Sequence, residues 1–415
     1  MTPLTPGSTS SIHDQFEELA AFNSDPDGGG ITREVFTPEY MEAVDYVSGL
    51  MRAAGLDVRL DEFANLFGRL EGTDPDAPHV LTGSHIDTTL NAGRYDGVLG
   101  VLGAIAAVRE LAAGGVRPRR SIEVVAFAGE EPRFVAGCLG SRALTGSLAR
   151  ADLDGLHDRD GVSLASALLD AGLDPDRVGS ARLDPRTIHC FVELHIEQGG
   201  VLERRGVPIG VVTHIAAPHD LLVTLRGEAS HAGATPMTLR RDALSGAAEA
   251  ALELERLALA SPGGTAVATI GVLRARPGAI NVIPGEVELE VDIRDREIGT
   301  RTALVDGFTQ ALEAIAARRG LELEITTITR DEPAACSEIV VDAARRACEE
   351  LGVKHIEMVS GAYHDAMVMG VDVPMGMVFV PSVGGISHSP LEFTAPEDLD
   401  RGVAVLAGTL AGLTR

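Results

Sequence analysis

Histidine and carboxylate side chains recur in five short motifs of this 415-residue chain, most of them directly after an apolar run. The motifs are GSHID (83–87), GRYDG (93–97), GEEPRF (129–134), ELHIEQG (193–199) and GGISHSP (384–390). Imidazole nitrogens and carboxylate oxygens form a ligand set that suits Zn, Mn, Co or Ni. The candidate ligands are His85, Asp96, Glu131, His195 and His388. No cysteine belongs to this set, which excludes a Cys-rich structural zinc site.

The residue types suggest how such a site would work. Asp87 can orient the imidazole of His85, as carboxylates beside metal-binding histidines do. Asp96 lies between glycines and offers two oxygens, so it can bridge two cations. The adjacent carboxylates of Glu130 and Glu131 repel each other unless a cation or proton separates them. One of them can then bind metal while the other takes a proton from water.

Each motif taken alone also fits a structural role, such as a surface or core histidine, a carboxylate at a helix N-terminus, or a solvated loop glutamate. The apolar runs beside the motifs favour the metal site. They predict strands at His79–Ser84, Ser121–Ala128 and Thr187–His195, and helices at Val98–Ala113 and Ser163–Ala171. This alternation predicts an α/β domain with a largely parallel sheet, in which functional groups gather at the carboxyl ends of the strands.

The pattern changes from Ala217 onward to the order β-α-β-β-α-β, which is the ferredoxin-like arrangement. The predicted elements are Leu221–Gly227, Arg241–Ala258, Thr265–Arg274, Val287–Ile293, Thr300–Arg318 and Leu321–Thr329. After Pro333 the α/β pattern resumes with Glu338–Leu351, Met375–Val380 and a helix from Pro396. We therefore expect a discontinuous α/β domain, 1–212 and 331–415, with a ferredoxin-like domain, 213–330, inserted into it.

Composition excludes several classes of protein. The formal charge of 35 − 61 = −26 argues against nucleic acid or an anionic membrane as a partner. Four scattered cysteines do not form a disulfide framework. The first residues lack the pattern of a signal peptide, and no apolar run is long enough to span a bilayer. By elimination, a cytoplasmic location is expected.

Nine motifs in order resemble the M20-type metallo-amidohydrolases: GSHID, GRYDG, GEEPRF, ELHIEQG, SHAGATPM, PGAINVIPG, DIRD, GAYHDA and GISHSP. The resemblance extends from about Phe16 to the C-terminus. It is to the carbamoylase branch, which comprises N-carbamoyl-L-amino acid hydrolases, allantoate amidohydrolases and ureidoglycolate amidohydrolases. The resemblance implies an α/β metallo-hydrolase domain and an inserted domain that serves as lid and dimerisation domain, with a hinge near Thr213 and Thr329.

The resemblance also implies roles for single residues. Two divalent metal ions, Mn²⁺ first and Zn²⁺, Co²⁺ or Ni²⁺ as alternatives, would be bridged by Asp96. His85 and His195 would each belong to a different metal, and the ligands named above would complete the set. Glu130 would be the general base, taking a proton from water and passing it to the departing nitrogen. Asp87 would hold His85.

The remaining implied roles concern the substrate. His231, in SHAG, would reach the site of a partner subunit in a homodimer and contact the scissile carbonyl; a structural turn histidine is the alternative. Asn281 and Arg294 would hold the substrate carboxylate, although Arg294 in DIRD also fits a surface ion pair. Gln198 and His364 resemble further contacts to the substrate.

The implied reaction is hydrolysis of a linear ureido or carbamoyl C–N bond on a small carboxylic acid, releasing ammonia and carbon dioxide. An M20-type aminoacylase or dipeptidase is the alternative. Some motifs resemble the ureidoglycolate enzymes and others the carbamoyl-amino-acid enzymes, so the substrate stays open. The segment between Pro132 and Cys138 is one residue shorter than the ureidoglycolate pattern, which puts the substrate pocket, not the metal site, in question.

Overall fold

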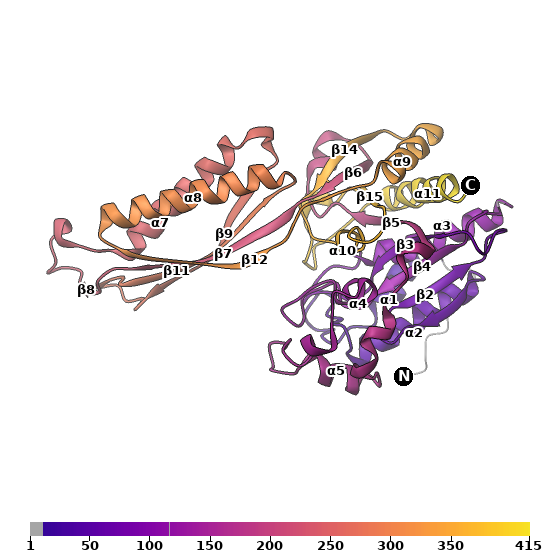
Figure 1. The fold of residues 1–415 in the computed structure, drawn as a ribbon, viewed down its shortest axis with the longest axis horizontal. Helices are drawn as coiled ribbons and strands as arrows, with labels where there is room; N and C mark the ends of the chain where they lie inside the picture. Colours follow the sequence, from indigo (N-terminus) through magenta and orange to yellow (C-terminus); the bar gives the residue numbers. More distant parts are fainter. Residues whose placement is uncertain (1–10, 116) are drawn as a thin grey trace. The chain divides into compact units, whose positions relative to one another are not determined.

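The computed structural model describes residues 11–115 and 117–415 and divides into two compact units (Figure 1). The first unit contains the described residues up to Thr213, Cys336–Met358 and His364–Arg415. The second contains His214–Ala335 and Val359–Tyr363. The domain limits 213 and 330 expected from the sequence stay a prediction about functional domains. Among the described residues, no helix has both the length and the apolar composition that a membrane span needs.

The first unit is a mixed sheet with helices packed on it. Its strands are β1 (Asp57–Leu60), β2 (Leu66–Leu70), β3 (His79–His85), β4 (Ile122–Phe127), β5 (Ile188–Ile196), β6 (Ile209–Ile215), β14 (His355–Ser360) and β15 (Met375–Val380). The spatial order is β1-β2-β4-β3-β5-β15-β6, and β14 also pairs with β6. The central strands β4, β3, β5 and β15 are parallel to one another, whereas β2, β1 and β6 join antiparallel. The expected parallel sheet is therefore confined to the four strands that carry the motifs.

Helices cover this sheet because its central strands are apolar on both faces. Every residue of β3 and of β4 is buried, which requires a packed layer on each side. The helices are α1 (Ile12–Ala20), α2 (Pro38–Ala53), α3 (Val98–Ala113), α4 (Leu139–Thr145), α5 (Leu164–Asp170), α6 (Val201–Arg205), α9 (Glu338–Leu351), α10 (Asp365–Met369) and α11 (Pro396–Leu413). Helices α3, α9 and α11 contact one another or the strands β3, β5 and β15.

The sequence patterns describe the elements around the motifs well and the first part of the chain poorly. The bounds of α3, α9 and β15 agree with prediction, and the other predicted elements are confirmed with small shifts of their ends. No element is predicted before His79, where the structure has α1, α2, β1 and β2. Helix α2 does carry local start signals, because Pro38 is its first residue and the Thr37 side chain accepts from Tyr40 N.

The second unit has the chain order β-α-β-β-α-β that the sequence predicts. Its main elements are β7 (Ala217–Arg226), α7 (Ala243–Ala260), β9 (Val267–Arg276), β11 (Glu286–Asp295), α8 (Ile298–Arg319) and β12 (Glu322–Arg330). The antiparallel sheet has the order β12-β7-β11-β9. Short strands β8 (Ser230–His231) and β10 (Val282–Ile283) form a separate pair, and β13 (Ala334–Ala335) pairs with the end of β6.

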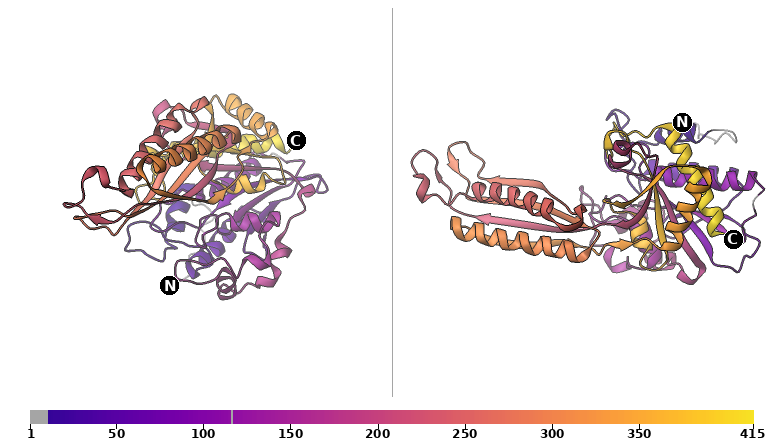
Figure 2. Two further views of the ribbon diagram at one scale, coloured as in Figure 1. Left: turned by 60° about the vertical axis from the view of Figure 1, so that its left-hand side comes forward. Right: turned by 90° about the horizontal axis from the view of Figure 1, so that it is seen from above.

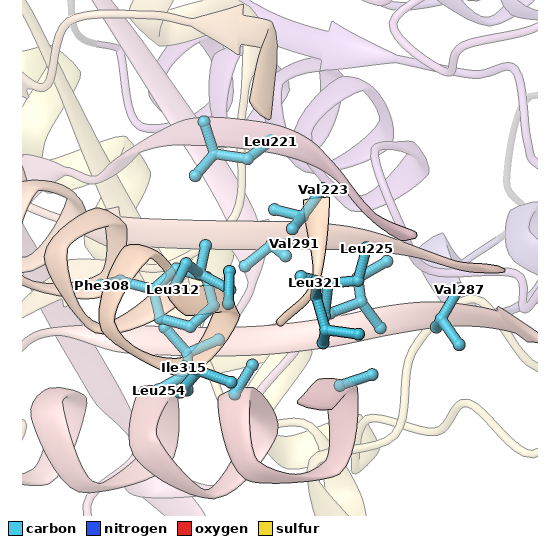
Figure 3. Packing of buried hydrophobic residues seen from close by; sticks show 14 of the residues in the cluster. Leu221, Val223, Leu225, Leu254, Val287, Val291, Phe308, Leu312, Ile315 and Leu321 are labelled. Carbon is cyan, nitrogen blue, oxygen red and sulfur yellow. The ribbon is translucent and has the colours of Figure 1, made fainter. Parts of the chain in front are cut away.

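Helices α7 and α8 run side by side along the four-stranded sheet (Figure 2). Strand β11 alternates strictly between buried and partly exposed residues, so one face of the sheet is turned to the helices. The core between the layers is apolar and includes Phe308, Leu312 and Ile315 of α8 against Val223 of β7 and Val291 of β11 (Figure 3).

Candidate metal centre

The five candidate ligands lie at or just beyond the carboxyl ends of the four parallel strands. His85 ends β3, His195 is the penultimate residue of β5, and Glu131 follows β4. Asp96 lies in the segment between β3 and α3, and His388 lies after β15. Because neighbouring parallel strands end at the same edge of a sheet, residues far apart in the sequence meet there.

Two overlapping groups of donor atoms form in this region. His85, Asp96 and His195 are one group and Asp96, Glu131 and His388 are the other, with the donor atoms of each group within 4.8 Å of one another. Asp96 Oδ1 lies 3.2 Å from His195 Nε2 and 4.0 Å from His85 Nε2. The other oxygen, Oδ2, lies 3.0 Å from His388 Nε2. One carboxylate thus presents one oxygen to each group, as a bridging ligand does.

This grouping favours a different arrangement from the one that the resemblance implies. His85 and His195 are expected to serve different metals, but the structure places both in the group around the same oxygen of Asp96. The physical reason is strand order. Strands β3 and β5 are direct neighbours, so histidines at their ends share one position, while the second group draws on β4 and β15.

The two strand histidines are held in the tautomer that metal binding needs. Nδ1 of His85 lies 3.1 Å from the carbonyl oxygen of Asp87, and Nδ1 of His195 lies 2.9 Å from the carbonyl oxygen of Ile196. A carbonyl oxygen only accepts, so each Nδ1 carries the proton. Each Nε2 then directs a lone pair toward Asp96, which is the arrangement typical of metal-bound histidine.

The electrostatics of the region fit divalent cations. Burial and then Asp96 raise the pKa of Glu131 to about 7, and burial raises the pKa of Glu130 well above its usual range. Burial also acts to raise the pKa of Asp96, but the neighbouring imidazoles of His195 and His388 outweigh it and lower that pKa well below its usual range. The hydrogen bond to Asp96 raises the pKa of His388 to about 9. Buried carboxylates this close need positive charge, and their N/O donors suit hard or borderline metals.

The backbone leaves no space for larger residues beside the donors. Gly97 has φ +66°, and a Cβ there would lie 2.3 Å from Nε2 of His85. The Gly97 N–H points at Nε2 of His195, 3.2 Å away. Glycine in GRYDG is thus required both by a backbone angle that other residues rarely adopt and by the close approach of the imidazole.

Asp87 joins the β3 end to the glutamate turn. Its carboxylate accepts hydrogen bonds from the N–H groups of Gly129, Glu130 and Glu131, at 3.2, 3.3 and 3.0 Å. It also lies 3.6 Å from His85 Nδ1. The side chain therefore orients the backbone of the glutamate pair as well as the imidazole of His85.

Glu130 lies beside the donors without belonging to either group. Its Oε2 is 3.6 Å from Nε2 of His85, and the Cys138 thiol lies 3.7 Å from its Oε1. A carboxylate whose pKa is raised by burial holds a proton more readily near neutral pH than an exposed one. That is the property a proton-transferring group needs.

Gln198 and His364 lie in the same unit as the donors. Gln198 Nε2 donates to Asp96 Oδ2 at 2.8 Å, and its buried Oε1 has no hydrogen-bond partner within the described part of the chain. The imidazole of His364 packs on His195 with ring centroids 4.5 Å apart. Burial, followed by the charge of His195, lowers the pKa of His364 well below its usual range, so this ring is neutral.

His231 and Asn281 lie in the second unit and are brought together there. His231 pairs with Val282 across β8 and β10, and the Ala232 N–H donates to the carbonyl oxygen of Asn281 at 2.9 Å. Nδ1 of His231 accepts from the N–H groups of Gly233 and Ala234, at 3.0 and 3.2 Å. The proton of the neutral ring is therefore on Nε2, on an exposed side chain.

Arg294 forms an ion pair with Asp292, which is the alternative role expected for it from the DIRD motif. Its Nε and Nη2 bind the carboxylate of Asp292, with a shortest distance of 2.7 Å, and Nη1 donates to the carbonyl oxygen of Gly361 at 2.8 Å. A half-buried guanidinium in this geometry is already bidentate to a carboxylate. A substrate anion that binds Arg294 would have to share the guanidinium with the carboxylate of Asp292 or displace that carboxylate.

Three buried carboxylates near the donors have no role assigned from the sequence, although Glu193 and Asp365 lie in two of its motifs. Glu193 accepts from Ser84 Oγ at 2.6 Å and forms a third donor group with His195 and His364. Asp365 accepts from Ser141 Oγ at 2.6 Å, and burial followed by Glu193 raises its pKa to about 7. A glutamate inside an apolar strand was a usable signal for Glu193. Glu392 carried no comparable signal, because nothing in its neighbourhood marks it as buried.

Comparison with known proteins identifies the family. The profile of the peptidase family M20/M25/M40 matches residues 81–412. The chain is 43% identical over 410 residues to a ureidoglycolate hydrolase of Arabidopsis thaliana, covering 97% of this chain and 86% of the relative. It is 45% identical over 394 residues to an N-carbamoyl-L-amino acid amidohydrolase of Geobacillus stearothermophilus, covering 95% of both. The chain belongs to the peptidase family M20/M25/M40.

A solved structure agrees with this assignment. A hydantoinase/carbamoylase-family amidase from Burkholderia multivorans has a TM-score of 0.91 and 34% identity, covering 97% of both chains. The predicted class of enzyme, a hydrolase of non-peptide carbon–nitrogen bonds in linear amides, is the class of the two relatives above. The mixed α/β fold expected from the sequence is confirmed.

Proposed function

We propose that this protein hydrolyses the ureido or carbamoyl C–N bond of a small carboxylic acid, of the N-carbamoyl-L-amino acid or ureidoglycolate/allantoate type. With one water consumed, the products are ammonia, carbon dioxide and the amine-bearing acid. The observation that carries the proposal is Asp96, whose two oxygens face two separate groups of metal donors. The names and full-length similarity of the relatives support the substrate class.

Two divalent cations, Mn²⁺ first, are the proposed cofactor. His85 and His195 would bind one cation, and Glu131 and His388 would bind the other. Asp96 would bind both cations. When bound, such ions polarise a carbonyl group and lower the pKa of water. The unpartnered Oε1 of Gln198, next to Asp96, offers a further acceptor for a substrate N–H group.

Glu130 has the position and the raised pKa to move protons in this reaction. It would take a proton from the attacking water and deliver it to the departing nitrogen. Asp87 would keep Glu130 in place by binding its backbone N–H. This bond fixes the backbone of Glu130, and the Glu130 carboxylate, which also accepts from the Cys138 thiol, would face both the water and the leaving group.

Residues of the second unit would bind and orient the substrate. His231 would donate its Nε2 proton to the scissile carbonyl oxygen, acting in the site of a partner subunit of a homodimer. Asn281 and Arg294 would hold the substrate carboxylate, with Arg294 exchanging part of its contact with Asp292 for the substrate. We propose residues 213–330 as the lid and dimerisation domain that carries these groups.

A substrate panel tests the proposal. The purified, Mn-loaded protein would be incubated with N-carbamoyl amino acids, ureidoglycolate, allantoate, β-ureidopropionate, N-acetyl amino acids and dipeptides, with ammonia and free amine as readouts. We expect ammonia release from ureido or carbamoyl acids and no turnover of acetyl amino acids or dipeptides. The opposite profile would establish an aminoacylase or dipeptidase and overturn the proposal.

A further inference from the structure

A buried carboxylate outside the donor groups connects the two loops that supply Asp96 and His388. Glu392 is 5% exposed and follows β15 by twelve residues. Its Oε1 accepts from the backbone N–H of Tyr95 at 2.9 Å and from that of Asp96 at 3.2 Å. Its Oε2 accepts from Ser387 Oγ at 2.7 Å. One side chain therefore binds the backbone of Asp96 and the residue before His388.

The same contacts extend to the carboxylate of Asp96. Ser387 Oγ lies 3.3 Å from Asp96 Oδ2, the oxygen that faces His388. Gly93 makes the approach of Glu392 feasible, because a Cβ at position 93 would lie 2.2 Å from Glu392 Oε1. The close approach of Glu392, a residue far from Gly93 in the sequence, therefore explains why the GRYDG motif begins with glycine.

The electrostatics argue against a role in packing alone. The carboxylate of Glu392 is buried and shares the hydroxyl group of Ser387 with the carboxylate of Asp96. A third carboxylate beside Asp96 and Glu131 is unfavourable unless cations offset the charge. An apolar side chain would fill the space without this cost, so hydrogen bonding to the two loops is what a carboxylate adds.

The two donor groups differ in how firmly they are held. His85 and His195 lie on fully buried strands, with their Nδ1 atoms fixed by backbone carbonyls. His388 is half-exposed, lies on a loop and has φ +52°. Its loop is tied to Asp96 through Ser387 and Glu392. Loss of Glu392 should therefore affect the His388 group more than the strand group.

We propose that Glu392 is a positioning residue that assembles the Asp96–Glu131–His388 donor group, so that removing it weakens one divalent-cation site and spares the other. The inference rests on the proposed metal centre. It assigns the Glu392 carboxylate a function in holding Asp96 and the loop residue His388 close enough to share one cation.

The test measures metal binding by the full-length apo protein. Mn²⁺ would be titrated into wild type, Glu392→Ala, Glu392→Gln and the control Glu397→Gln, which alters an exposed glutamate at the start of α11. Calorimetry would give stoichiometry and affinity, and electron paramagnetic resonance would distinguish coupled Mn²⁺ pairs from single ions. In wild type and Glu397→Gln we expect two bound ions and a coupled spectrum.

In Glu392→Ala we expect one ion bound as in wild type and the other weakened by about 10–100-fold, the usual effect of losing a residue that orients metal ligands. Single-ion spectra should replace the coupled signal. Glu392→Gln should recover most of the affinity, because its amide oxygen still accepts from Tyr95 and Asp96 N–H. Ser387→Ala removes only the side-chain hydroxyl that joins Glu392 to Asp96, so it should weaken the same cation site by a smaller factor. This variant replaces Glu392→Ala in the test if Glu392→Ala does not fold.

Three outcomes would overturn the assignment. Unchanged binding of both ions by the variants would show that Glu392 does not position the group. Equal weakening of both sites, with a lower melting temperature and no rescue by glutamine, would show a general structural role. Absence of Mn²⁺ binding by the wild type would instead overturn the proposed metal centre itself, and with it this inference.

Discussion

The two compact units differ in what they bury. The second unit has an apolar core, and two of its buried polar side chains bind backbone groups. Arg301 donates to the carbonyl oxygens of Ala217 and Pro218, and Asp295 accepts from the N–H of Glu297. The first unit buries a connected set of histidines and carboxylates at the ends of its parallel strands. This set comprises His85, Asp87, Asp96, Glu131, Glu193, His195, His364, Asp365 and Glu392.

This contrast separates stability from chemistry. An apolar core stabilises by removing surface from water, and its residues are exchangeable if volume is kept. Buried charges cost free energy unless they are paired or bind metal. The buried carboxylates and histidines at one edge of the sheet therefore lower the stability of the first unit unless they bind cations, and such groups are typical of catalytic sites. Metal and proton-transfer changes should therefore affect the first unit, and changes of packing should affect the second.

Removal of metal should have the largest effect. Dialysis against a chelator should lower ammonia release to background, and Mn²⁺ should restore it. The free energy of unfolding should also fall, because cations that offset Asp96 and Glu131 bind only the folded protein; about 2.7 kcal/mol is expected at a metal concentration 100 times the Kd. Thermal melting with and without Mn²⁺ measures this. Identical melting curves would show that the buried carboxylates do not need a cation.

Glu130→Gln should come next. The substitution keeps the shape of the side chain but removes its ability to take a proton, so kcat should fall by about 10²–10⁴-fold. Mn²⁺ binding should persist, because Glu130 belongs to neither donor group. Steady-state kinetics and metal analysis of the same preparation test both statements. Unchanged turnover would remove Glu130 from its proposed role.

Phe308→Ala should destabilise the second unit and leave metal binding intact. Phe308 is fully buried in the apolar core, so truncation should cost about 3–5 kcal/mol in free energy of unfolding. Denaturant unfolding measures the cost, and Mn²⁺ titration at low temperature checks the metal site. Loss of Mn²⁺ affinity in the folded variant would contradict the separation of the two units' roles.

Arg256→Ala should have the smallest effect. Arg256 pairs with Glu253 on the exposed surface of α7, three residues apart. Exposed ion pairs are screened by solvent and contribute little to stability. We expect the melting temperature, Mn²⁺ affinity and kcat to match wild type. A measurable loss in any of these three quantities would indicate that this face of α7 contacts another molecule.

Much of this molecule was predictable from local pattern. Helix α3 and strand β15 have the expected bounds, because each is a largely apolar run flanked by glycine or proline, Gly97 and Gly114 for α3 and Pro374 and Pro381 for β15. The five candidate ligands were found because chemistry-bearing residues follow apolar strands. The elements before His79 are not predicted. Helix α2 carries usable start signals at Thr37 and Pro38, whereas β1 and β2 are strands of only four and five residues, too short for a clear pattern.

The amino-acid sequence is sufficient to identify the residue types of the site, the main strands and helices from His79 onward, and the family to which the motifs belong. The grouping of His85 and His195 around one oxygen of Asp96 becomes visible only in the folded chain, because strand order in a sheet does not follow chain order. The folded chain likewise shows that Arg294 binds Asp292 and that Glu392 binds the backbone of Asp96. The contacts of Asp96 with His195 and Glu392 join residues that are distant in the sequence, so their spacing along the chain does not predict them; they form only when the sheet brings the residues together.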